Sequence, residues 1–389
     1  MHNLYGFVQL TWWGYITVTF ALTQLMLLGV TLYLHRDQSH GGLRLHPAVR
    51  HFFRFWLWFS SSTITKEWVA VHRRHHVFTD QPGDPHSPVL FGLKRVLTEG
   101  YELYSAAAYD PHTLEHYGRG TPDDWVERNL YSRYPRLGIV IFIVCQLLLF
   151  GVPAISMLGV QLIAQPLLAA GIINGLGHRL GYRSFEIPVA ATNIVPWGLL
   201  IAGEELHNNH HAFPSSPRFS VQRWEVDIGW VIICVLRSLG LASVNHLASL
   251  PSRASHRETI DSAMAMTLFT NRLHVLRDYR LQVLEPTLSA LVRRQDAAVL
   301  TRQTSLLIRR HPKLLTEAGR VQVREVLERY EGLRTVVEFR DALQSIWDET
   351  NAAQENALAR WAQFCELAAR SNIEALRAFV GRLHMYRAS

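Results

Sequence analysis

The longest uncharged stretches of the chain predict helices that cross a membrane. Residues 3–34 carry no charged side chain, and this length exceeds the ~20 apolar residues that a helix needs to span the hydrocarbon core of a bilayer. Trp12, Trp13 and Tyr15 near one end and Tyr33 near the other are typical of anchors at the membrane–water interface. We therefore expect one span in this region.

A second uncharged stretch, residues 137–173, predicts a hairpin of two spans. Gly151, Val152 and Pro153 interrupt it near its middle, which fits two helices of ~18 residues joined by a tight turn. Pro166 is expected to kink the second helix. With the first stretch, the pattern predicts about three spans.

Three histidine clusters follow apolar segments. The first reads HRDQSH at residues 35–40, and the others read HRRHH at 72–76 and HNNHH at 207–211. Imidazole binds iron, zinc, copper and nickel. Positions i, i+3 and i+4 share one face of a helix, so each HxxHH is expected to bring three imidazoles to one small volume.

The number of histidines predicts two metal ions. Eight imidazoles are too many for one zinc, which takes four ligands, and the lack of clustered thiolates argues against iron–sulfur chemistry. Redox-active iron that handles oxygen fits better than hydrolytic zinc, because the site adjoins a membrane and not an open aqueous cleft.

A shared metal centre constrains the topology. A crossing between His40 and His72 would place the clusters ~30 Å apart, so the shorter apolar segments 51–65 and 187–203 are predicted to be in-plane or re-entrant helices. Lys and Arg are absent before Tyr33 and abundant in residues 36–136. The histidine side is therefore predicted to be cytoplasmic, with the N-terminus outside.

Composition narrows the class further. The net charge is +7 and 48% of the 389 residues are hydrophobic, but the basic residues do not form one stripe with interleaved aromatics, so no nucleic-acid partner is expected. The three cysteines are scattered without a CxxC pair. This pattern argues against a disulfide framework and suits a reducing compartment. No cleavable signal peptide is predicted.

The composition changes after about Pro251. Residues 256–389 are rich in Arg, Leu, Ala and Glu with helical periodicity, and about five helices are expected, with breaks at Pro286 and Pro312. No segment there is long and uncharged enough to span. The chain is thus predicted to be all-α, with a membrane domain at 1–250 and a soluble helical extension at 251–389. Parts of the extension resemble the helical C-terminal segment of some bacterial transposases, from which no activity is inferred.

The boxes and their flanks resemble those of membrane acyl-CoA (stearoyl-type) fatty acid desaturases. The matching residues are HRxxSH at 35–40, EWVxxHRxHH at 67–76, DPH at 84–86 and GExxHNxHHxFP at 203–214. The stretch ExDxGW at 225–230 also matches bacterial members. The resemblance covers roughly residues 10 to 245.

This resemblance implies a ligand set for two iron ions. The family has a further histidine four positions after an Asn that holds a metal-bound water, and Asn174 and His178 fit this spacing. The implied metal site comprises His35, His40, His72, His75, His76, His178, His207, His210 and His211, with Asn174 acting through water. No catalytic residue beyond these ligands is expected.

Residues near the boxes are expected to support the ligands. Glu204, Asp84 and Asp37 are candidates to orient ligand imidazoles, because metal-bound histidines usually donate their other N–H to a carboxylate or carbonyl. His86 is interpreted as a supporting or structural residue. Trp68 either walls an acyl channel or packs, and Arg73, Arg74, Lys94 and Arg95 are candidates to meet a coenzyme A or lipid phosphate.

The resemblance further implies O2-dependent insertion of a double bond, of delta-9 type, into a saturated acyl-CoA or acyl-lipid. The His-Pro-Gly-Gly motif of a fused cytochrome b5 domain is absent, so a separate carrier of the ferredoxin–reductase type is expected to supply electrons. The expected location is the bacterial inner membrane, with the active site and C-terminus on the cytoplasmic side.

Three alternatives stay open at this point. A membrane di-iron hydroxylase or monooxygenase uses similar boxes but leaves oxygen on its product. A metal transporter or sensor would carry charged groups inside its spans, and both long uncharged stretches lack them. A partner-binding scaffold with a dead site is disfavoured, because every box histidine is retained.

Overall fold

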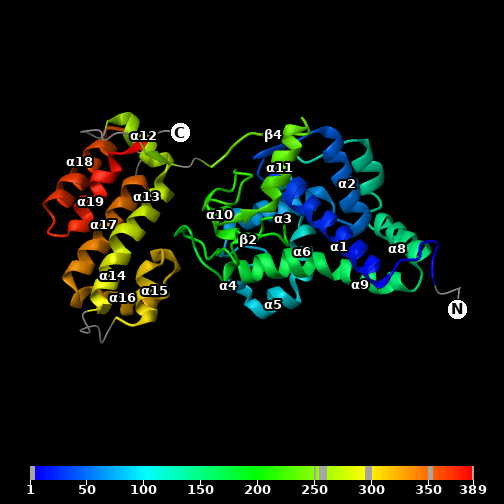
Figure 1. Cartoon of the computed structure of the whole chain (residues 1–389), viewed down its shortest axis with the longest axis horizontal. Coiled ribbons are helices and arrows are strands. Elements are labelled where there is room, and N and C mark those ends of the chain that lie inside the picture. The colour runs from blue at the N-terminus through cyan, green and yellow to red at the C-terminus, as the bar shows by residue number, and fades with distance from the viewer. Residues whose placement is uncertain (1–4, 249–250, 254–260, 294–299, 349–353, 388–389) are drawn as a thin grey trace. The chain divides into compact units, whose positions relative to one another are not determined.

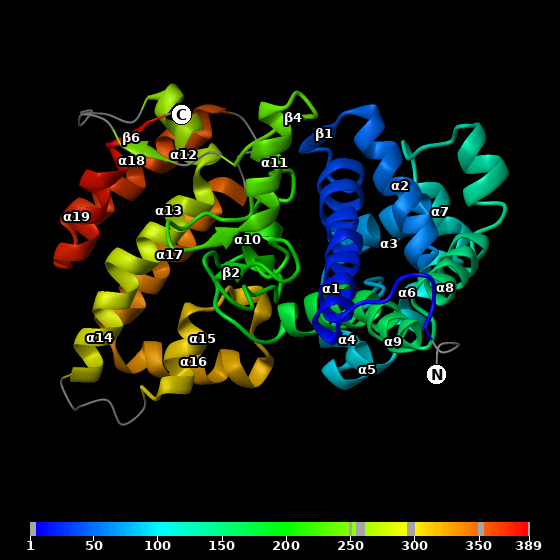
Figure 2. The ribbon, with the colours of Figure 1, turned by 45° about the vertical axis from the view of Figure 1, so that its right-hand side comes forward.

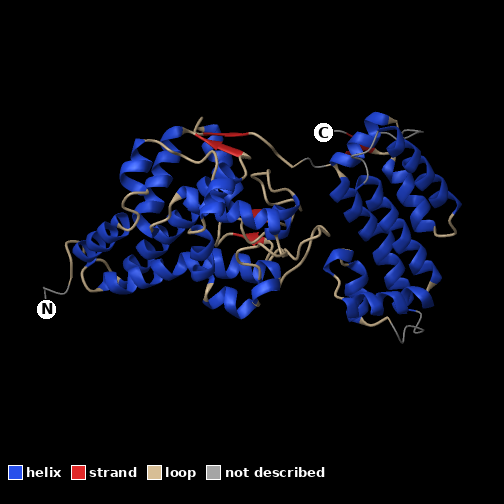
Figure 3. Ribbon diagram, turned by 180° about the vertical axis from the view of Figure 1, so that it is seen from behind, coloured by secondary structure: helices blue, strands red, loops and turns tan. Residues whose placement is uncertain are grey.

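The computed structural model describes residues 5–248, 251–253, 261–293, 300–348 and 354–387. These residues are mostly helical with a few short strands, as the sequence predicts (Figures 1 and 3). They divide into two compact units. Unit 1 comprises Met1–Arg183 and Ala190–Ala248, and unit 2 comprises Ser184–Val189 and Ser249–Ser389.

Unit 1 contains α-helices, π-helical and 3₁₀ stretches, and short strands. In chain order they are α1 (Trp12–Leu28), η2 (Gly29–Ser39), β1 (Leu43–Leu45), α2 (Pro47–Ser61), α3 (Thr65–Phe78), α4 (Pro88–Phe91), α5 (Leu93–Thr98), α6 (Gly100–Ala108), α7 (Pro111–Tyr117), η3 (Glu127–Tyr131), α8 (Leu137–Phe150), α9 (Pro153–Gln165), η4 (Pro166–Ile173), η5 (Leu176–His178), β2 (Trp197–Gly198), α10 (His207–Ala212), β3 (Val226–Asp227), α11 (Ile228–Ser238) and β4 (Ala242–Val244).

Two helical runs in the described part of the chain are long and apolar enough to cross a membrane. Trp12–Ser39 joins α1 to η2, and Pro153–His178 runs from α9 through η4 to η5. The Thr11 side chain accepts the backbone N–H of Gly14 and so caps the first run. Both runs match the predicted spans, and together with the family assigned below they indicate a membrane protein.

The predicted hairpin turns where expected, at Gly151, which lies between α8 and α9 with φ of 64°. Its first arm, α8, has 14 residues, which is shorter than the ~20 of a standard span. Pro166 opens the π-helical stretch η4. Because proline lacks an N–H, a change of hydrogen-bonding pattern at this position is expected.

Of the two shorter helices that the sequence predicts as in-plane or re-entrant, most of residues 51–65 is helical as part of α2, whereas the helix predicted at residues 187–203 is wrong. No residue from 187 to 203 is helical, and β2 is the only named element in that range. Pro188 and Pro196 cannot donate to a helix ladder. Ala202 and Gly203 have positive φ, a conformation that glycine adopts readily. Position 203 also has no room for a side chain, because a Cβ there would collide with Arg36 and Asp227.

The helices of unit 1 pack around one apolar core. Helix α2 lies between α1 and α8 (Figure 2), and α1 also packs on α9. The core includes Leu27, Leu32, Leu34 and Leu57, all nearly inaccessible to solvent. Strand β1 pairs with β4 in antiparallel register, while β2 pairs with β3 in parallel. The β1–β4 pair ties the end of the first box to the segment that follows α11.

Unit 2 is a helical bundle around its own core. Its elements are β5 (Ser252–Arg253), α12 (Ser262–Thr270), α13 (Arg272–Tyr279), η6 (Arg280–Leu284), α14 (Glu285–Arg293), α15 (Arg302–Arg309), η7 (Pro312–Leu314), α16 (Glu317–Arg329), α17 (Glu331–Asp348), α18 (Gln354–Arg370), α19 (Glu374–Leu383) and β6 (Tyr386–Arg387). Strand β5 pairs with β6. Its described α-helices are more numerous than the five expected.

The two predicted helix breaks in unit 2 have different outcomes. Pro312 follows the end of α15 and opens the 3₁₀ turn η7, so the break there is confirmed. Pro286 lies inside a run that continues from α13 through η6 into α14, so the break there is wrong. A π-helical turn immediately before proline absorbs its missing hydrogen bond without ending the helix.

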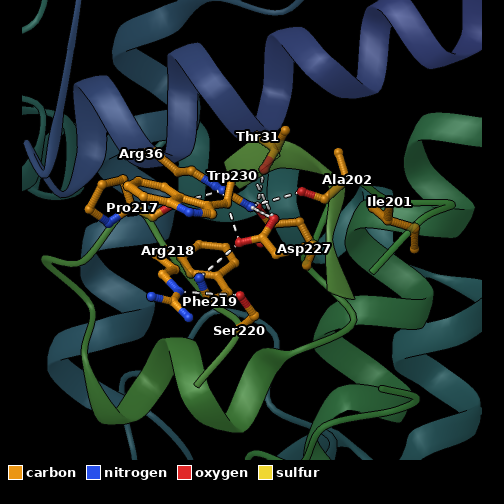
Figure 4. Close-up of polar contacts among 12 residues, drawn as sticks. Thr31, Arg36, Ile201, Ala202, Pro217, Arg218, Phe219, Ser220, Asp227 and Trp230 are labelled. Atoms are coloured by element: carbon orange, nitrogen blue, oxygen red, sulfur yellow. Dashed lines mark hydrogen bonds and ion pairs between the residues drawn. The ribbon is translucent and has the colours of Figure 1, made fainter. Parts of the chain in front are cut away.

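A buried ion pair joins the first histidine box to the chain after the third (Figure 4). Arg36 contacts both carboxylate oxygens of Asp227 at 3.1 and 3.2 Å, and it donates to the backbone carbonyls of Ala202 and Pro217 at 2.8 Å each. Its guanidinium lies 3.9 Å from the ring centre of Phe219. Asp227 also accepts the N–H of Trp230 and caps α11.

Removing one member of this buried pair should destabilise the protein strongly. We expect Arg36→Met to lose about 3–5 kcal/mol of stability, because Asp227 would remain buried without its cation. Arg95→Met, which breaks the exposed pair with Glu99 on α5, should cost about 0.5 kcal/mol or less. Thermal unfolding of both variants in detergent checks this, and equal unfolding midpoints would contradict the assignment.

Candidate metal centre

The structure brings all nine sequence-predicted histidines together in two adjacent clusters. Within each cluster the nearest ring nitrogens lie within 4.8 Å of one another. Cluster A contains His35, His40, His72, His76 and His210, and cluster B contains His75, His178, His207 and His211. Short approaches between rings, such as a distance of 4.5 Å between the ring centres of His76 and His211, connect the two clusters.

The spacing of the nitrogens fits ions held between them. In cluster A the Nε2 atoms of His35 and His210 lie 2.9 Å apart, and that of His76 lies 3.0 Å from His210. In cluster B the Nε2 of His207 lies 3.0 Å from that of His178 and 3.1 Å from that of His211. Two imidazoles bound at right angles to one ion at ~2.1 Å would place their nitrogens ~3 Å apart.

Each HxxHH box contributes to both clusters, which differs from the expected convergence of three rings. His72 and His76 enter cluster A while His75 enters cluster B. Successive residues lie ~100° apart around an α-helix, so i+4 lies about 40° to one side of i and i+3 about 60° to the other, which leaves the rings at i+3 and i+4 about 100° apart. The third box shows the reverse assignment, since its i, i+4 pair enters cluster B and His210 enters cluster A.

A π-helical turn brings the two histidines of the first box together. Five residues along an α-helix turn a side chain by ~500°, which would leave His35 and His40 facing apart. In η2 the N–H of His40 bonds instead to the carbonyl of His35 at 3.2 Å, the i→i+5 pattern of a π-turn. Their ring centres consequently lie 5.0 Å apart.

Buried carboxylates fix the orientation of three of the rings. Glu204 accepts from Nδ1 of His35 at 2.7 Å, and Asp84 accepts from Nδ1 of His75 at 3.0 and 3.1 Å. A carboxylate can only accept, so Nδ1 carries the hydrogen and Nε2 keeps its lone pair for a metal. Both carboxylates are among the sequence candidates.

The third orienting carboxylate was missed by the sequence analysis, and one candidate has another role. Asp80 accepts from Nδ1 of His178 at 3.1 Å. It lies in a loop far from His178 in sequence, and its position four residues before Asp84 is the only sequence feature that could have pointed to it. Asp37 pairs with Arg50 and not with a ligand. Asp80 has a φ of 61°, so the turn holds a non-glycine residue in a left-handed conformation.

Burial disfavours the protonated form of six of the nine histidines, and the carboxylate of Glu204 stays charged. Burial, aided by the charges of neighbouring histidines, lowers the pKa far below its usual value in His40, His72, His76, His207, His210 and His211. Burial works to raise the pKa of Glu204, but the charge and hydrogen bond of His35 outweigh it, and this pKa falls. Neutral imidazole is the form that binds a metal.

Unsatisfied nitrogens support the fit to metal ions. Among the described residues, the buried Nε2 of His75 has no hydrogen-bond partner, although its Nδ1 is fixed by Asp84. Buried polar atoms are rarely left without partners. The donor set, which combines all-imidazole ligands with oriented Nδ1–H groups and no thiolate, therefore fits two iron ions.

The remaining predicted ligands lie at the C-terminal end of the long run α9–η4–η5. His178 ends η5, and Gly177 allows His207 to approach, since a Cβ at Gly177 would lie 3.2 Å from the ring. Asn174 lies four residues earlier and lines the same cavity as His207. It is thus placed beside the clusters rather than within either group of ring nitrogens.

A cavity of about 440 Å³ adjoins the clusters. This volume falls in the range of small-molecule sites. Four histidines line it (His35, His72, His86, His207), together with apolar side chains that include Leu27, Val30, Val71, Leu162 and Ile173. The indole of Trp68 lines it too and stacks on His72 at 4.9 Å between ring centres. The cavity can hold an alkyl chain beside the clusters.

Other candidate residues have mainly internal roles. Arg73 donates to the carbonyls of Gln38, Ser39, Tyr117 and Arg119, which ties the end of the first box to α7. Arg74 pairs with Asp110 and Arg95 with Glu99. His86 stacks on His75 at 4.6 Å between ring centres, and burial lowers its pKa to about 3.

Neutralising Glu204 should weaken metal binding. In Glu204→Gln the amide N–H₂ can face His35 and favour the tautomer that protonates Nε2, so we expect a 10–100-fold loss of affinity. Glu205→Gln is the matched control, because Glu205 is equally buried but accepts backbone N–H groups of Leu200, Ile201 and Gly203. Chelator competition on the iron-loaded proteins measures both, and similar affinities in the two variants would contradict the role of Glu204.

Glu67, in the first turn of α3, should make stability depend on pH. Burial, with a smaller effect of the charge on Glu127, raises its pKa from 4.5 to about 7. An acid with a raised folded-state pKa destabilises the fold as pH rises from 4.5 through 7. Glu67→Gln should therefore raise stability by on the order of 1–2 kcal/mol above pH 7, allowing for partial exposure, and change it little at pH 4.5.

Unfolding midpoints at pH 4.5 and pH 8 measure this effect. The exposed Glu102 of α6 provides the control substitution Glu102→Gln, which should shift neither midpoint. A Glu67→Gln protein with the same pH profile as the native chain would rule out the predicted penalty.

Comparisons with known proteins agree with this geometry. Residues 10–228 match the family model for fatty acid desaturases, and residues 266–389 match a family model described as transposase. Delta-9 acyl-lipid desaturase 1 of Arabidopsis thaliana is 30% identical over 236 residues, which cover 59% of this chain and 73% of the relative. Acyl-CoA 5-desaturase AL21 of Anemone leveillei is 30% identical over 220 residues, with 55% and 66% covered.

A third relative, icosanoyl-CoA 5-desaturase of Limnanthes douglasii, is 29% identical over 240 residues, which cover 60% of this chain and 64% of the relative. The desaturase model covers more than half of the chain and spans every histidine of both clusters. The buried imidazoles, the adjoining cavity and these matches lead to one conclusion: the chain belongs to the fatty acid desaturase family and is an oxidoreductase.

Proposed function

We propose that the protein is a di-iron, O2-dependent desaturase that introduces a double bond, of delta-9 type, into a saturated acyl-CoA or acyl-lipid. The observation that carries this proposal is the pair of histidine clusters beside a largely apolar cavity. The relatives include both acyl-lipid and acyl-CoA desaturases, and both delta-9 and 5-desaturases.

The proposed ligands are the nine histidines of clusters A and B, with Asn174 acting through water. When bound, two iron ions would supply the transfer of electrons to O2. The overall reaction consumes one O2, two electrons and two protons, takes one hydrogen from each of two neighbouring methylenes, and yields the alkene and two waters. A separate carrier of the ferredoxin–reductase type supplies the electrons.

The protein's own residues contribute position, charge state and exclusion of water. Asp80, Asp84 and Glu204 hold Nδ1–H groups, so that Nε2 faces the ions. An alkyl chain has no polar group by which it can be oriented, so the apolar cavity wall with Trp68 must set which carbon pair lies beside the clusters. Arg73 and Arg74 are engaged within the protein, whereas Lys94 and Arg95 are exposed and are the candidates for a substrate phosphate.

We further propose a topology in the bacterial inner membrane. The runs α1–η2 and α9–η4 cross the bilayer, and α8 crosses it as a shorter third span. The abundance of basic residues between 36 and 136 supports an orientation with the clusters and the C-terminus on the cytoplasmic side. Residues 1–250 form the desaturase domain, and residues 251–389 form a helical extension.

Expression in a host that lacks desaturase activity tests the function. Gas chromatography of its fatty acids should show a new unsaturated peak, which His75→Ala should abolish because cluster B loses a ligand that is held by Asp84. His51→Ala is the control, since His51 is exposed on α2 and belongs to neither cluster. A hydroxylated product instead of an alkene would reject desaturation, and a peak that survives in His75→Ala would reject the ligand set.

A further inference from the structure

A short segment of chain that interrupts unit 1 belongs to unit 2. Ser184–Val189 is grouped with unit 2, whereas the residues on either side belong to unit 1. Phe185 is 1% exposed and its ring meets that of His274 edge-on at 5.2 Å between centres. Glu186 pairs with Arg280 at 3.3 Å. His274 and Arg280 lie on the run α13–η6, which packs in the core of unit 2. Unit 2 therefore holds this segment through a buried ring contact and an ion pair.

The residue after this segment contacts the carboxylate that orients a ligand. The N–H of Ala190 donates to Oδ2 of Asp80 at 2.7 Å, and the same oxygen accepts from Nδ1 of His178 at 3.1 Å. The position of Ala190 thus helps to fix the carboxylate, and the carboxylate fixes the ring of His178.

Ala191 and Asn193 form hydrogen bonds with the third histidine box, residues 207–211. The carbonyl of Ala191 accepts from the side chain of Asn208 at 3.0 Å. Asn193 exchanges two hydrogen bonds with Asn209, at 3.0 and 3.1 Å. Asn208 and Asn209 lie between His207 and His210 in sequence. Residues 190–193 therefore contact both the His178 support and the helix that carries the last three histidines.

We propose that Phe185 and Glu186 are positioning residues for cluster B, because unit 2 holds the loop whose return stretch supports His178 and α10. The coupling runs through the peptide bond between Val189 and Ala190, and it requires no surface between the two units. Ordering a free loop costs backbone entropy, and unit 2 reduces the entropy lost by residues 190–193 because it already fixes the six residues before them. This inference rests on the proposed iron-binding function of cluster B.

The first test removes the buried ring contact between Phe185 and unit 2 in the full-length protein. In Phe185→Ser the buried ring is lost, and we expect iron to be released to a chelator about tenfold faster, the lower range for loss of a residue that supports a ligand. Phe185→Leu keeps an apolar side chain and should release iron at nearly the native rate. Amide hydrogen exchange of the peptide that contains residues 190–193 should accelerate in Phe185→Ser and stay native-like in Phe185→Leu.

The second test decouples the segment without changing a side chain. A Gly-Gly-Ser-Gly insertion between Val189 and Ala190 leaves Phe185 in place but lets Ala190 move, and it should accelerate both iron release and exchange at residues 190–193. The same insertion between Gly120 and Thr121, at an exposed turn of unit 1, is the control and should change neither. If both insertions behave alike, the inference is overturned.

A third variant separates this coupling from general destabilisation of unit 2. Val326 of α16 is fully buried in the unit 2 core, and Val326→Ala should lower the unfolding midpoint of that unit while iron release stays native. Equal acceleration in Val326→Ala and Phe185→Ser would overturn the specific role. A native protein without stoichiometric iron would instead refute the proposed function, and the exchange data would still test the coupling.

Discussion

The hydrogen bond from a buried imidazole Nδ1–H to a carboxylate is the interaction on which the centre depends. Glu204, Asp84 and Asp80 each accept one such bond. A buried carboxylate is costly unless it is paired, and an imidazole presents a lone pair at Nε2 only when the hydrogen is on Nδ1. Each bond meets both requirements, because the imidazole N–H pairs the buried carboxylate and the carboxylate keeps the hydrogen on Nδ1. The apolar surroundings disfavour protonated histidine and so preserve ligands.

Two departures from the ordinary α-helix build the clusters. The π-helical stretch η2 brings His40 and His35 to the same side, where their rings meet edge-on, which an α-helix cannot do at this spacing. In α3 and α10 the ~100° between successive residues sends the i+3 histidine of each HxxHH to the opposite cluster from its i, i+4 pair. The mirrored use of two identical spacings lets two helices share two ion sites, which explains why the clusters lie so close together.

The same segments that present ligands are also held by polar anchors away from the clusters. Arg36, next to His35, is buried against Asp227, Phe219 and two backbone carbonyls, and the asparagines between His207 and His210 bind the stretch 190–193. Charged and polar side chains in the boxes are therefore as much a part of the fold as the apolar core. Unit 2 extends this support, because it contains the six residues that precede Ala190.

Local pattern determined much of this protein. Uncharged length predicted the run from Trp12 and the hairpin that turns at Gly151, and box spacing predicted eight of the nine histidines, because ring chemistry and helical periodicity depend on neighbouring residues; His178 came only from the family resemblance. Tertiary structure alone decided the rest. Asp80 meets His178 across 98 positions of sequence, and residues 187–203 form an irregular support in place of a helix. These features depend on contacts between distant segments, for which hydropathy and spacing contain no signal.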